Sequence, residues 1–448
     1  MTQNSTESIK SKYKIIHDTI HRTIKLEEPA LSLLETPELQ RLNCIHQLGF
    51  AYHVFPGANH TRLEHSLGTF HVANAMANAL NLDDEEKLLV STAAILHDLG
   101  HGPYSHTIEY LLETRLGISH TRLTGKIIKG EENIFDESIE KILQPRKRVH
   151  DILMEYNIDV DTVVSLICSE LRSLDHTLNF TSTLPVHKKQ QFFNSKSYLF
   201  QIIHSSIDAD QIDYLLRDSF YTGVAHGVLD IERLIQTIEI FNNDLVVNKH
   251  GLSAVEGMLV ARALMYSSVY FHKTVRIAEL MLSRCLERLE DDQLAEFITM
   301  PEGELIFKLQ GMGGLQNELI NLLMYRKLFK RVFYIKNTEL DDSNIEIIQK
   351  LDDPKVRLQT EDEIVERAGV PEGHVIIDVP TKELKFSEPR VHKTDIKILD
   401  GSVKPLSRYT PLAQALRLKN IPEWALMIIT DNKFKEQVLK ASKKVIFG

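Results

Sequence analysis

The chain has 448 residues, with 52 lysines and arginines against 62 aspartates and glutamates, so its formal charge is −10 before histidine is counted. Hydrophobic residues make up 43% and charged residues 25%, which is ordinary for a folded protein and excludes collagen, coiled-coil and disordered classes. The acidic balance argues against a general nucleic-acid coat, because such proteins need dense lysine and arginine.

The cysteines and the apolar runs bear on the cellular compartment. Cys44, Cys168 and Cys285 are far apart and form no CxxC pair, which indicates reduced thiols and not a disulfide framework. No apolar run reaches the length of about 18 residues that a membrane span needs, and the polar start lacks a secretory signal. We therefore expect a cytoplasmic protein with no membrane span.

The pattern along the chain predicts a mainly α fold with a smaller C-terminal α+β region. Residues 1–12 are polar and are expected to be a flexible N-terminus, followed by a helical domain over 13–329. Apolar residues recur every three or four positions and predict helices over 31–49, 64–80, 84–100, 198–222 and 254–289, with a short extended piece at 51–57. In the C-terminal region, 330–448, β-branched runs predict strands over 330–336, 374–379, 395–399 and 424–430.

The strongest local signal is the segment ILHDLGHGPYSH, residues 95–106. His97 and Asp98 adjoin near the end of an apolar helix, and His101 lies one turn on from His97. Imidazole and carboxylate together can bind one divalent cation, leaving His101 and His106 for proton transfer or phosphate contact. A helix end decorated with polar residues is the alternative, but the two further histidines favour a site.

Two other segments carry side chains that can complete a metal site. His65 lies in HTRLEHSLG, with Arg62 three residues earlier, although a lone helix histidine is more often structural. The other segment is SSIDADQIDYLLRDS, residues 205–219. Its residues Asp210, Tyr214 and Asp218 recur at four-residue spacing and therefore share one helix face.

The same acidic helix admits a simpler interpretation as a solvated face. Asp208 and Asp213 are then the exposed carboxylates of the segment. The apolar flank IDYLL indicates burial instead, and a buried carboxylate needs a partner or a metal ion.

In this order the segments resemble the HD-domain metal-dependent phosphohydrolases. The pattern H…HD…D is carried by His65, His97–Asp98 and Asp210. The wider text is similar to the branch containing the dNTP triphosphohydrolases of the sterile-alpha-motif/HD type, without the sterile-alpha-motif domain. The matching segments are TPELQRLNCIHQLGFAYHVFPGANHTRLEHSLG, AAILHDLGHGPYSH, IDADQIDYLLRDSFYTGV and YFHKTVR. The resemblance implies an HD core over about residues 45–220.

The resemblance implies a metal centre and a set of catalytic residues beside it. His65, His97, Asp98 and Asp210 would hold one divalent ion, and Fe, Mn, Zn and Mg all remain open. Such an ion polarises a phosphoryl oxygen and supplies a water nucleophile near neutral pH. The implied catalytic acid/base is His106, oriented by Glu109, with His101 and His120 against the phosphates. An additional Mg²⁺ can accompany the nucleotide.

The resemblance also implies the substrate contacts. Gln47 would read a sugar 3′-hydroxyl while close packing rejects a 2′-hydroxyl, and Arg62 would clamp phosphate. The other implied contacts are on the sugar side and on a basic–aromatic helix face, which would otherwise be a surface helix: Tyr214, Asp218, Arg262, Tyr266, Tyr270, His272 and Lys273. Tyr266 does not match the family segment.

The sequence departs from that branch at three positions. Gln211 stands where the branch usually has Lys or Arg on a phosphate, which weakens the expected grip on triphosphate. Thr121 replaces a common acidic residue, and Glu109 stands where Asp is familiar.

We therefore expect a metal-dependent enzyme that hydrolyses deoxynucleoside triphosphates to deoxynucleoside and inorganic triphosphate, as a homo-oligomer, dimer or tetramer. Gln211 motivates an alternative, an HD phosphohydrolase acting on a nucleoside monophosphate or an oligonucleotide end. A third hypothesis, less favoured, is a non-catalytic module that binds single-stranded nucleic acid through the basic clusters at 145–150 and 187–189. The complete set of metal positions argues against it.

Overall fold

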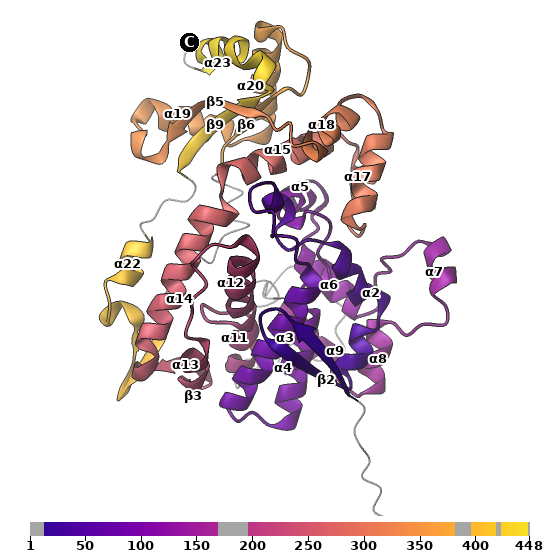
Figure 1. The fold of residues 1–448 in the computed structure, drawn as a ribbon, viewed down its shortest axis with the longest axis vertical. Coiled ribbons are helices and arrows are strands. Elements are labelled where there is room, and N and C mark those ends of the chain that lie inside the picture. Colours follow the sequence, from indigo (N-terminus) through magenta and orange to yellow (C-terminus); the bar gives the residue numbers. More distant parts are fainter. Residues whose placement is uncertain (1–12, 169–195, 381–395, 418–422, 447–448) are drawn as a thin grey trace, which may run out of the picture.

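The computed structural model describes residues 13–168, 196–380, 396–417 and 423–446. This part of the chain is mainly helical with small sheets, as predicted, and most of its C-terminal α+β region lies at one end of the helical body (Figure 1). None of its helices combines the length and the apolar character needed to cross a membrane. The expected flexible N-terminus, 1–12, and the basic cluster 187–189 lie outside the described residues.

An antiparallel hairpin opens the described chain. Strand β1 (Tyr13–Asp18) pairs with β2 (Arg22–Glu27), from Tyr13 opposite Glu27 to Asp18 opposite Arg22. On β2 the buried Ile24 and Leu26 alternate with exposed neighbours, so one face of the hairpin packs on the helical body. This stretch was predicted to be part of the helical domain, and the hairpin was not predicted.

The helical body is built around α3, which packs against both α4 and α12 (Figure 1). Its helices up to the α+β region are α1 (Ala30–Leu34), α2 (Pro37–Gln40), α3 (Arg62–Ala79), α4 (Asp84–Leu96), α5 (Ser105–Leu116), α6 (His120–Ile128), α7 (Glu137–Leu143), α8 (Val149–Glu155), α9 (Val160–Ile167), α11 (Ser197–Ile203), α12 (Ala209–Thr222), α13 (Ile231–Gln236), α14 (Leu252–Met265), α15 (Lys273–Glu287), α16 (Asp291–Glu296), α17 (Glu302–Gly311) and α18 (Gly314–Met324). A large apolar core runs between them.

Capping residues fix where the site-bearing helices begin. Thr61 forms a capping box with Glu64 at the start of α3, and Asp83 forms one with Glu86 at the start of α4. The Asp208 carboxylate accepts from the amide of Gln211 and so caps α12. These starts place the candidate ligands on the first turns of α3 and α12 and at the end of α4.

Three predicted helices are interrupted. The segment 31–49 is interrupted because Thr36 caps the short helix α2 and Pro37 occupies its first position. Two 3₁₀ turns follow, and the second overlaps the segment 51–57, where an extended piece was expected. The segment 198–222 splits into α11 and α12 at the Asp208 cap. The segment 254–289 splits at a π turn over Tyr266–Tyr270.

The predicted C-terminal strands are present, but they belong to two sheets. One sheet is antiparallel and has the strand order β5 (Lys330–Lys336), β9 (Trp424–Thr430), β6 (Val375–Asp378). Every residue of its central strand β9 is buried. The other has the order β3 (Ile238–Phe241), β4 (Asp244–Asn248), β7 (Lys397–Asp400), β8 (Ser402–Pro405), with β7 parallel to β4. The remaining helices are α19 (Asp342–Leu351), α20 (Pro354–Ala368), α22 (Leu412–Arg417) and α23 (Lys435–Ile446).

Buried ion pairs join α15 to strand β6 of the three-stranded sheet and to helix α20. Arg276 Nη2 lies 2.8 Å from Asp378 Oδ1, and Arg284 Nη2 lies 2.5 Å from Glu361 Oε2. Asp378 also accepts from the Trp424 indole at 2.8 Å. Removing one partner of such a pair leaves a buried charge without compensation.

Candidate metal centre

Three of the four predicted metal ligands meet where α3, α4 and α12 come together. His65 comes from the first turn of α3, His97 follows the end of α4, and Asp210 lies in the first turn of α12. One ligand atom from each lies within 4.8 Å of the others. Both imidazoles are buried, and the carboxylate is partly buried.

The hydrogen bonds of the two histidines fit a cation. His97 Nδ1 lies 2.8 Å from the carbonyl oxygen of Ala94, and His65 Nδ1 lies 2.8 Å from Asp213 Oδ2. Because a carbonyl and an ionised carboxylate only accept, each Nδ1 must carry a proton, so the nitrogen left to bind a cation is Nε2, which faces the site. His65 Nε2 lies 3.0 Å from Asp210 Oδ1, and His97 Nε2 lies 3.9 Å from that oxygen. Lone pairs facing a carboxylate need a positive charge between them.

The pKa of His65 reflects the negative charges of the two neighbouring carboxylates, Asp210 and Asp213. Burial opposes protonation, but the hydrogen bonds and charges of Asp210 and Asp213 outweigh it and raise the pKa of His65 to about 10. A divalent cation at Nε2 would take the place of that proton. The residues present therefore fit a metal ion held by one carboxylate and two imidazoles.

Asp98 lies beside this group. Its Oδ1 is 3.2 Å from His97 Nε2 and 3.3 Å from His101 Nε2, and its Oδ2 accepts from Arg62 Nη1 at 2.7 Å. Burial raises the pKa of this carboxyl, but the neighbouring His97, His101 and Arg62 side chains hold it well below its usual range. An ionised carboxylate thus stays next to the candidate ligands, as a fourth ligand requires.

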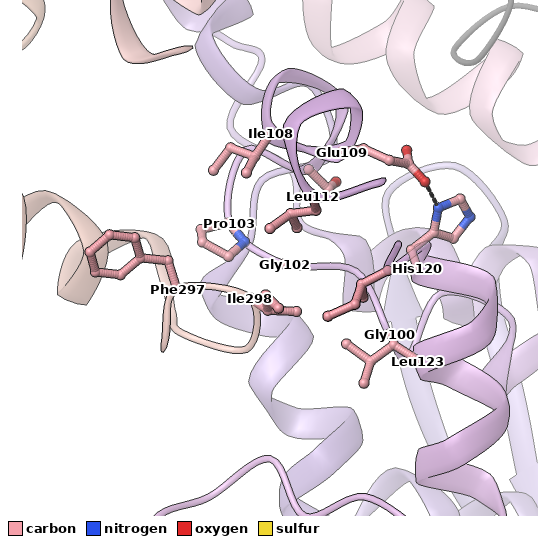
Figure 2. Close-up of a pocket in the computed structure, with 12 residues that line it drawn as sticks. Gly100, Gly102, Pro103, Ile108, Glu109, Leu112, His120, Leu123, Phe297 and Ile298 are labelled. Atoms are coloured by element: carbon pink, nitrogen blue, oxygen red, sulfur yellow. Dashed lines mark hydrogen bonds and ion pairs between the residues drawn. The ribbon is translucent and has the colours of Figure 1, made fainter. Parts of the chain in front are cut away.

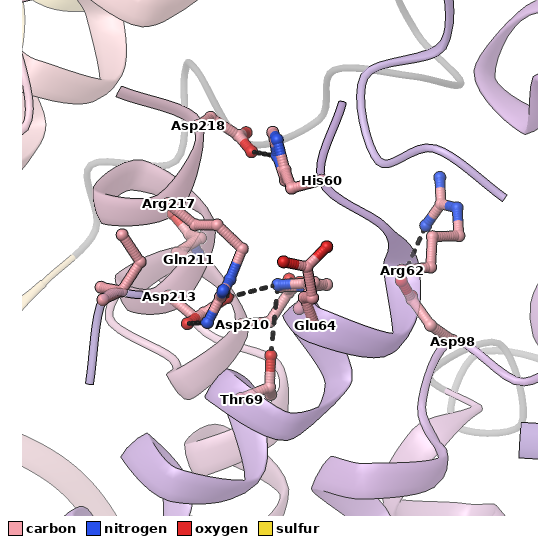
Figure 3. Close-up of polar contacts among 12 residues, drawn as sticks. His60, Arg62, Glu64, Thr69, Asp98, Asp210, Gln211, Asp213, Arg217 and Asp218 are labelled. Carbon is pink, nitrogen blue, oxygen red and sulfur yellow. Dashed lines mark hydrogen bonds and ion pairs between the residues drawn. The ribbon is translucent and has the colours of Figure 1, made fainter. Parts of the chain in front are cut away.

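Asp208 and Asp213, offered by the sequence as exposed carboxylates, are both buried, so this interpretation is wrong. Asp208 is the cap of α12. Asp213 lies against Arg217 (Figure 3) and also binds His65 and His21. His21 comes from the unpredicted hairpin, and its Nε2 lies 2.6 Å from Asp213 Oδ1. No motif signalled this contact.

A second group of titratable side chains lies next to Asp98. The rings of His101 and His120 stack with centroids 3.9 Å apart, and His120 Nδ1 forms a short hydrogen bond with Glu109. Burial, with the charges of Arg62 and His120, holds the pKa of His101 well below its usual value. Burial lowers the pKa of His120, but Glu109 outweighs it and raises that pKa. The site therefore favours the neutral form of His101 and the protonated form of His120.

A small, mostly apolar cavity adjoins Glu109 and His120 between α5, α6 and the 297–298 segment (Figure 2). Its apolar lining is Pro103, Ile108, Leu112, Ile118, Leu123, Phe297 and Ile298. Apolar walls strengthen an ion pair by keeping water away. The predicted acid/base His106 lies in the first turn of α5, but its side chain is outside the described residues.

The predicted phosphate-binding arginines are buried and held by hydrogen bonds. Arg62 donates to Asp98 and, from Nη2, to Ser105 Oγ at 2.8 Å. Arg262 Nη1 donates to Gln211 Oε1 at 2.6 Å. Gln211 therefore positions a neighbouring cation at the place where the related branch carries a cation of its own.

The predicted sugar side contains a buried network that includes an unpredicted histidine. Asp218 Oδ1 lies 2.7 Å from His60 Nε2, and its Oδ2 accepts from the Tyr270 hydroxyl at 2.7 Å. The Tyr214 and Tyr270 rings meet edge to face at 6.1 Å. The backbone amide of Gln47 donates to the carbonyl of His60 at 3.0 Å, so this network adjoins Gln47.

The remaining predicted contacts differ in exposure. Gln47 is buried, and its Oε1 has no hydrogen-bond partner among the described residues, so it is available to a bound hydroxyl. Tyr266 is buried and Lys273 is exposed. His272 caps α15 by accepting from the amide of Thr274 at 3.2 Å, which is a structural role. The predicted face over 262–273 is interrupted by the π turn.

The helical fold and the buried histidine–carboxylate group define a protein with a candidate metal site. Residues 62–218 match the family described as HD domain, and residues 229–447 match the HD associated region. The chain is 30% identical to the uncharacterized protein MJ1154 of Methanocaldococcus jannaschii over 446 residues, which covers 96% of this chain and 84% of the relative. This chain belongs to the family of HD-domain phosphohydrolases with an HD-associated region.

More distant relatives carry a named activity. The chain is 25% identical to human deoxynucleoside triphosphate triphosphohydrolase SAMHD1, over 76% of this chain and 53% of that protein. A hypothetical protein from Aquifex aeolicus has a similar solved structure, with a TM-score of 0.67, 28% identity and coverage of 96% of this chain and 100% of that one. A phosphohydrolase from Bacteroides thetaiotaomicron, at 22% identity and a TM-score of 0.65, shares the fold over 94% of this chain and 100% of its own.

Proposed function

We propose that this HD-domain phosphohydrolase hydrolyses deoxynucleoside triphosphates, giving deoxynucleoside and inorganic triphosphate. The observation that carries the proposal is the juxtaposition of the His65, His97 and Asp210 group with Arg62, a buried arginine next to Asp98. The similarity to the SAMHD1 triphosphohydrolases supports the substrate class. A divalent ion, held by this group and Asp98, would supply Lewis acidity toward a phosphoryl oxygen.

The chain's own residues supply orientation and proton transfer. Arg62 is held by Asp98 and Ser105, so its guanidinium is positioned before a phosphate arrives. Glu109 favours the protonated form of His120, which would present a positive N–H donor beside His101. A protonated imidazole in this place can neutralise phosphate charge or give a proton to the leaving oxygen.

Selection of the sugar is assigned to Gln47 and the Asp218 network. The free Gln47 Oε1 can accept from a 3′-hydroxyl, and His60 and Tyr270 fix the Asp218 carboxylate nearby. A site built to hydrogen-bond a hydroxyl discriminates strongly against an analogue that leaves its polar group unpaired. We propose a homo-oligomer as the working form, as is common for soluble enzymes.

The test is product identification with a nucleotide panel. The Mn²⁺-loaded protein is incubated with each dNTP, alone and as a mixture of all four, and inorganic triphosphate is separated from pyrophosphate and phosphate. Triphosphate release by the unaltered protein and its loss in Asp210→Asn is the expected result. His17→Gln is the matched control, because His17 is exposed on the hairpin.

Two results would contradict the proposal. Absence of triphosphate under every nucleotide condition, from protein shown to bind Mn²⁺, would refute the substrate class. Phosphate release from nucleoside monophosphates or oligonucleotide ends would assign the metal centre to that alternative, which Gln211 motivates.

A further inference from the structure

One buried carboxylate behind the metal centre has an unusual number of partners. Asp213 Oδ2 lies 2.8 Å from His65 Nδ1 and accepts from Arg217 Nε at 2.9 Å. Its Oδ1 lies 2.6 Å from His21 Nε2 and accepts from Arg217 Nη2 at 3.0 Å. The side chain is fully buried, so both oxygens depend on these donors.

Helix α3 is shaped to admit this carboxylate. Gly68 lies one turn after His65, and a Cβ built on it would come within 1.9 Å of Asp213 Oδ1 and 2.4 Å of Arg217 Nη2. Atoms that are not covalently bonded do not approach this closely, so any side chain at this position would displace the carboxylate. Glycine therefore makes room for Asp213 to reach the imidazole of a candidate ligand.

The N-terminal hairpin closes the other side of the group. Asp18 accepts from the amide of His21 at 2.7 Å, which fixes the tight turn between β1 and β2. Arg217 Nη1 then donates to Asp18 Oδ2 at 2.8 Å, so the same guanidinium holds both Asp18 and Asp213. The turn residues of the hairpin thus contact the carboxylate that contacts His65.

We infer that Asp213 is a positioning residue that holds the His65 ring with Nε2 directed at the metal position, and that the hairpin, through His21 and Asp18, is part of this device. A carboxylate on the far nitrogen of a metal-binding histidine fixes the tautomer and the ring orientation and raises the basicity of the ligand. The inference rests on the metal centre of the proposed function but not on its substrate.

A purely structural role makes a different prediction. If the Asp213 group served only to hold α3, α12 and the hairpin together, its loss would lower thermal stability and leave the metal environment unchanged. If it positions His65, its loss alters the affinity and the ligand field of the bound ion even in a folded protein.

The experiment uses the full chain with Co²⁺ as the probe. Affinity is measured by chelator competition, and the visible d–d absorption of bound Co²⁺ reports the ligand geometry. We expect Asp213→Asn to weaken Co²⁺ binding about 10-fold to 100-fold and to change the spectrum, and His21→Gln to do so about 10-fold. His17→Gln, on the exposed face of the same hairpin, is the matched control and keeps both properties.

The outcomes separate this inference from the proposed function. If the unaltered protein binds Co²⁺, and both His21→Gln and Asp213→Asn bind it with the same affinity and spectrum, the inference is overturned while the metal centre stands. If Asp213→Asn does not fold, His21→Gln decides the question by the same two readouts. If the unaltered protein itself fails to bind Co²⁺, Mn²⁺ or Fe²⁺, the proposed function fails together with the inference.

Discussion

Substitution of Gly68 by alanine tests the packing behind the metal centre. Gly68 lies inside α3, where replacing glycine by alanine ordinarily stabilises a helix by about 1 kcal/mol. At this position the new methyl group would lie 1.9 Å from Asp213 Oδ1, so helix propensity and packing oppose each other.

The packing effect is expected to win. Overpacking a buried site costs about 1–3 kcal/mol. Displacing a fully buried carboxylate from Arg217, His21 and His65 adds the cost of breaking a buried ion pair, about 3–5 kcal/mol when a partner is lost completely. Because the carboxylate would shift without being removed, we expect a net loss of about 2–4 kcal/mol, with weaker binding of Co²⁺.

Urea unfolding of the metal-free protein measures the change, and Gly257→Ala is the control. Gly257 lies inside α14, is exposed, and has nothing within 4 Å of its built Cβ, so alanine there should raise stability by about 0.5–1 kcal/mol. A Gly68→Ala protein as stable as the unaltered one, with unchanged Co²⁺ affinity, would refute the reasoning.

Three further predictions concern the acid–base pair, the C-terminal region and the metal. Glu109 raises the pKa of His120, so activity that needs protonated His120 should persist above the usual histidine pKa of about 6.5 and fall as the pH rises through the raised value. In a kcat/KM profile, Glu109→Gln should move this fall in activity to lower pH. Asp378→Asn should lower the free energy of unfolding by about 3–5 kcal/mol by uncoupling Arg276, whereas Arg276→Met with Asp378→Leu should cost less in urea titrations. Removing divalent ions with a chelator should lower Tm, and adding Mn²⁺ at 100 times its Kd should raise the free energy of unfolding by about 2.7 kcal/mol. A Tm that the chelator leaves unchanged would count against the metal centre.

The candidate ligands were predictable because each stands in a short motif with its own chemistry. His97 and Asp98 are adjacent, and His65 and Asp210 lie in segments whose order matches a known pattern. The residues that support them were not predictable in this way. His21 meets Asp213 across 192 positions of sequence, and His60 meets Asp218 across 158. Such contacts depend on the hairpin and on the α3–α12 packing, and no local spacing encodes either.

The secondary structure shows the same division between local and tertiary causes. The C-terminal strands were recognised because β-branched runs are bounded by polar turns, but their distribution over two sheets depends on a parallel pairing between β4 and β7. The helix breaks at Thr36–Pro37 and at Asp208 carry local signals, since Thr36 and Asp208 are N-cap residues and Pro37 is a first-turn proline. These capping signals were therefore sufficient to predict both breaks. In β2, the alternation of Ile24 and Leu26 with polar neighbours was the available sign of the hairpin.

Gln211 carries a prediction about the grip on phosphate. It is fully buried, its Oε1 accepts from Arg262 Nη1 at 2.6 Å, and its Nε2 donates to the carbonyl of Ser205 at 2.8 Å and to Asp208 Oδ2 at 3.1 Å. A lysine at 211 would match the related triphosphohydrolases but has no acceptor for Arg262 and places a second cation beside it.

We therefore expect Gln211→Lys to lower Tm and to gain more Tm from added inorganic triphosphate than the unaltered protein does, because the anion offsets the repulsion between the two cations. Gln211→Met removes the hydrogen bonds without adding charge and should lose about 1–3 kcal/mol with no extra response to triphosphate. If Gln211→Lys is as stable as the unaltered protein and hydrolyses dNTPs faster, Gln211 does not position Arg262, and the missing cation limits this enzyme. If Gln211→Lys is less stable and hydrolyses dNTPs more slowly, Gln211 positions Arg262, and Arg262 supplies the positive charge for a phosphate in this chain.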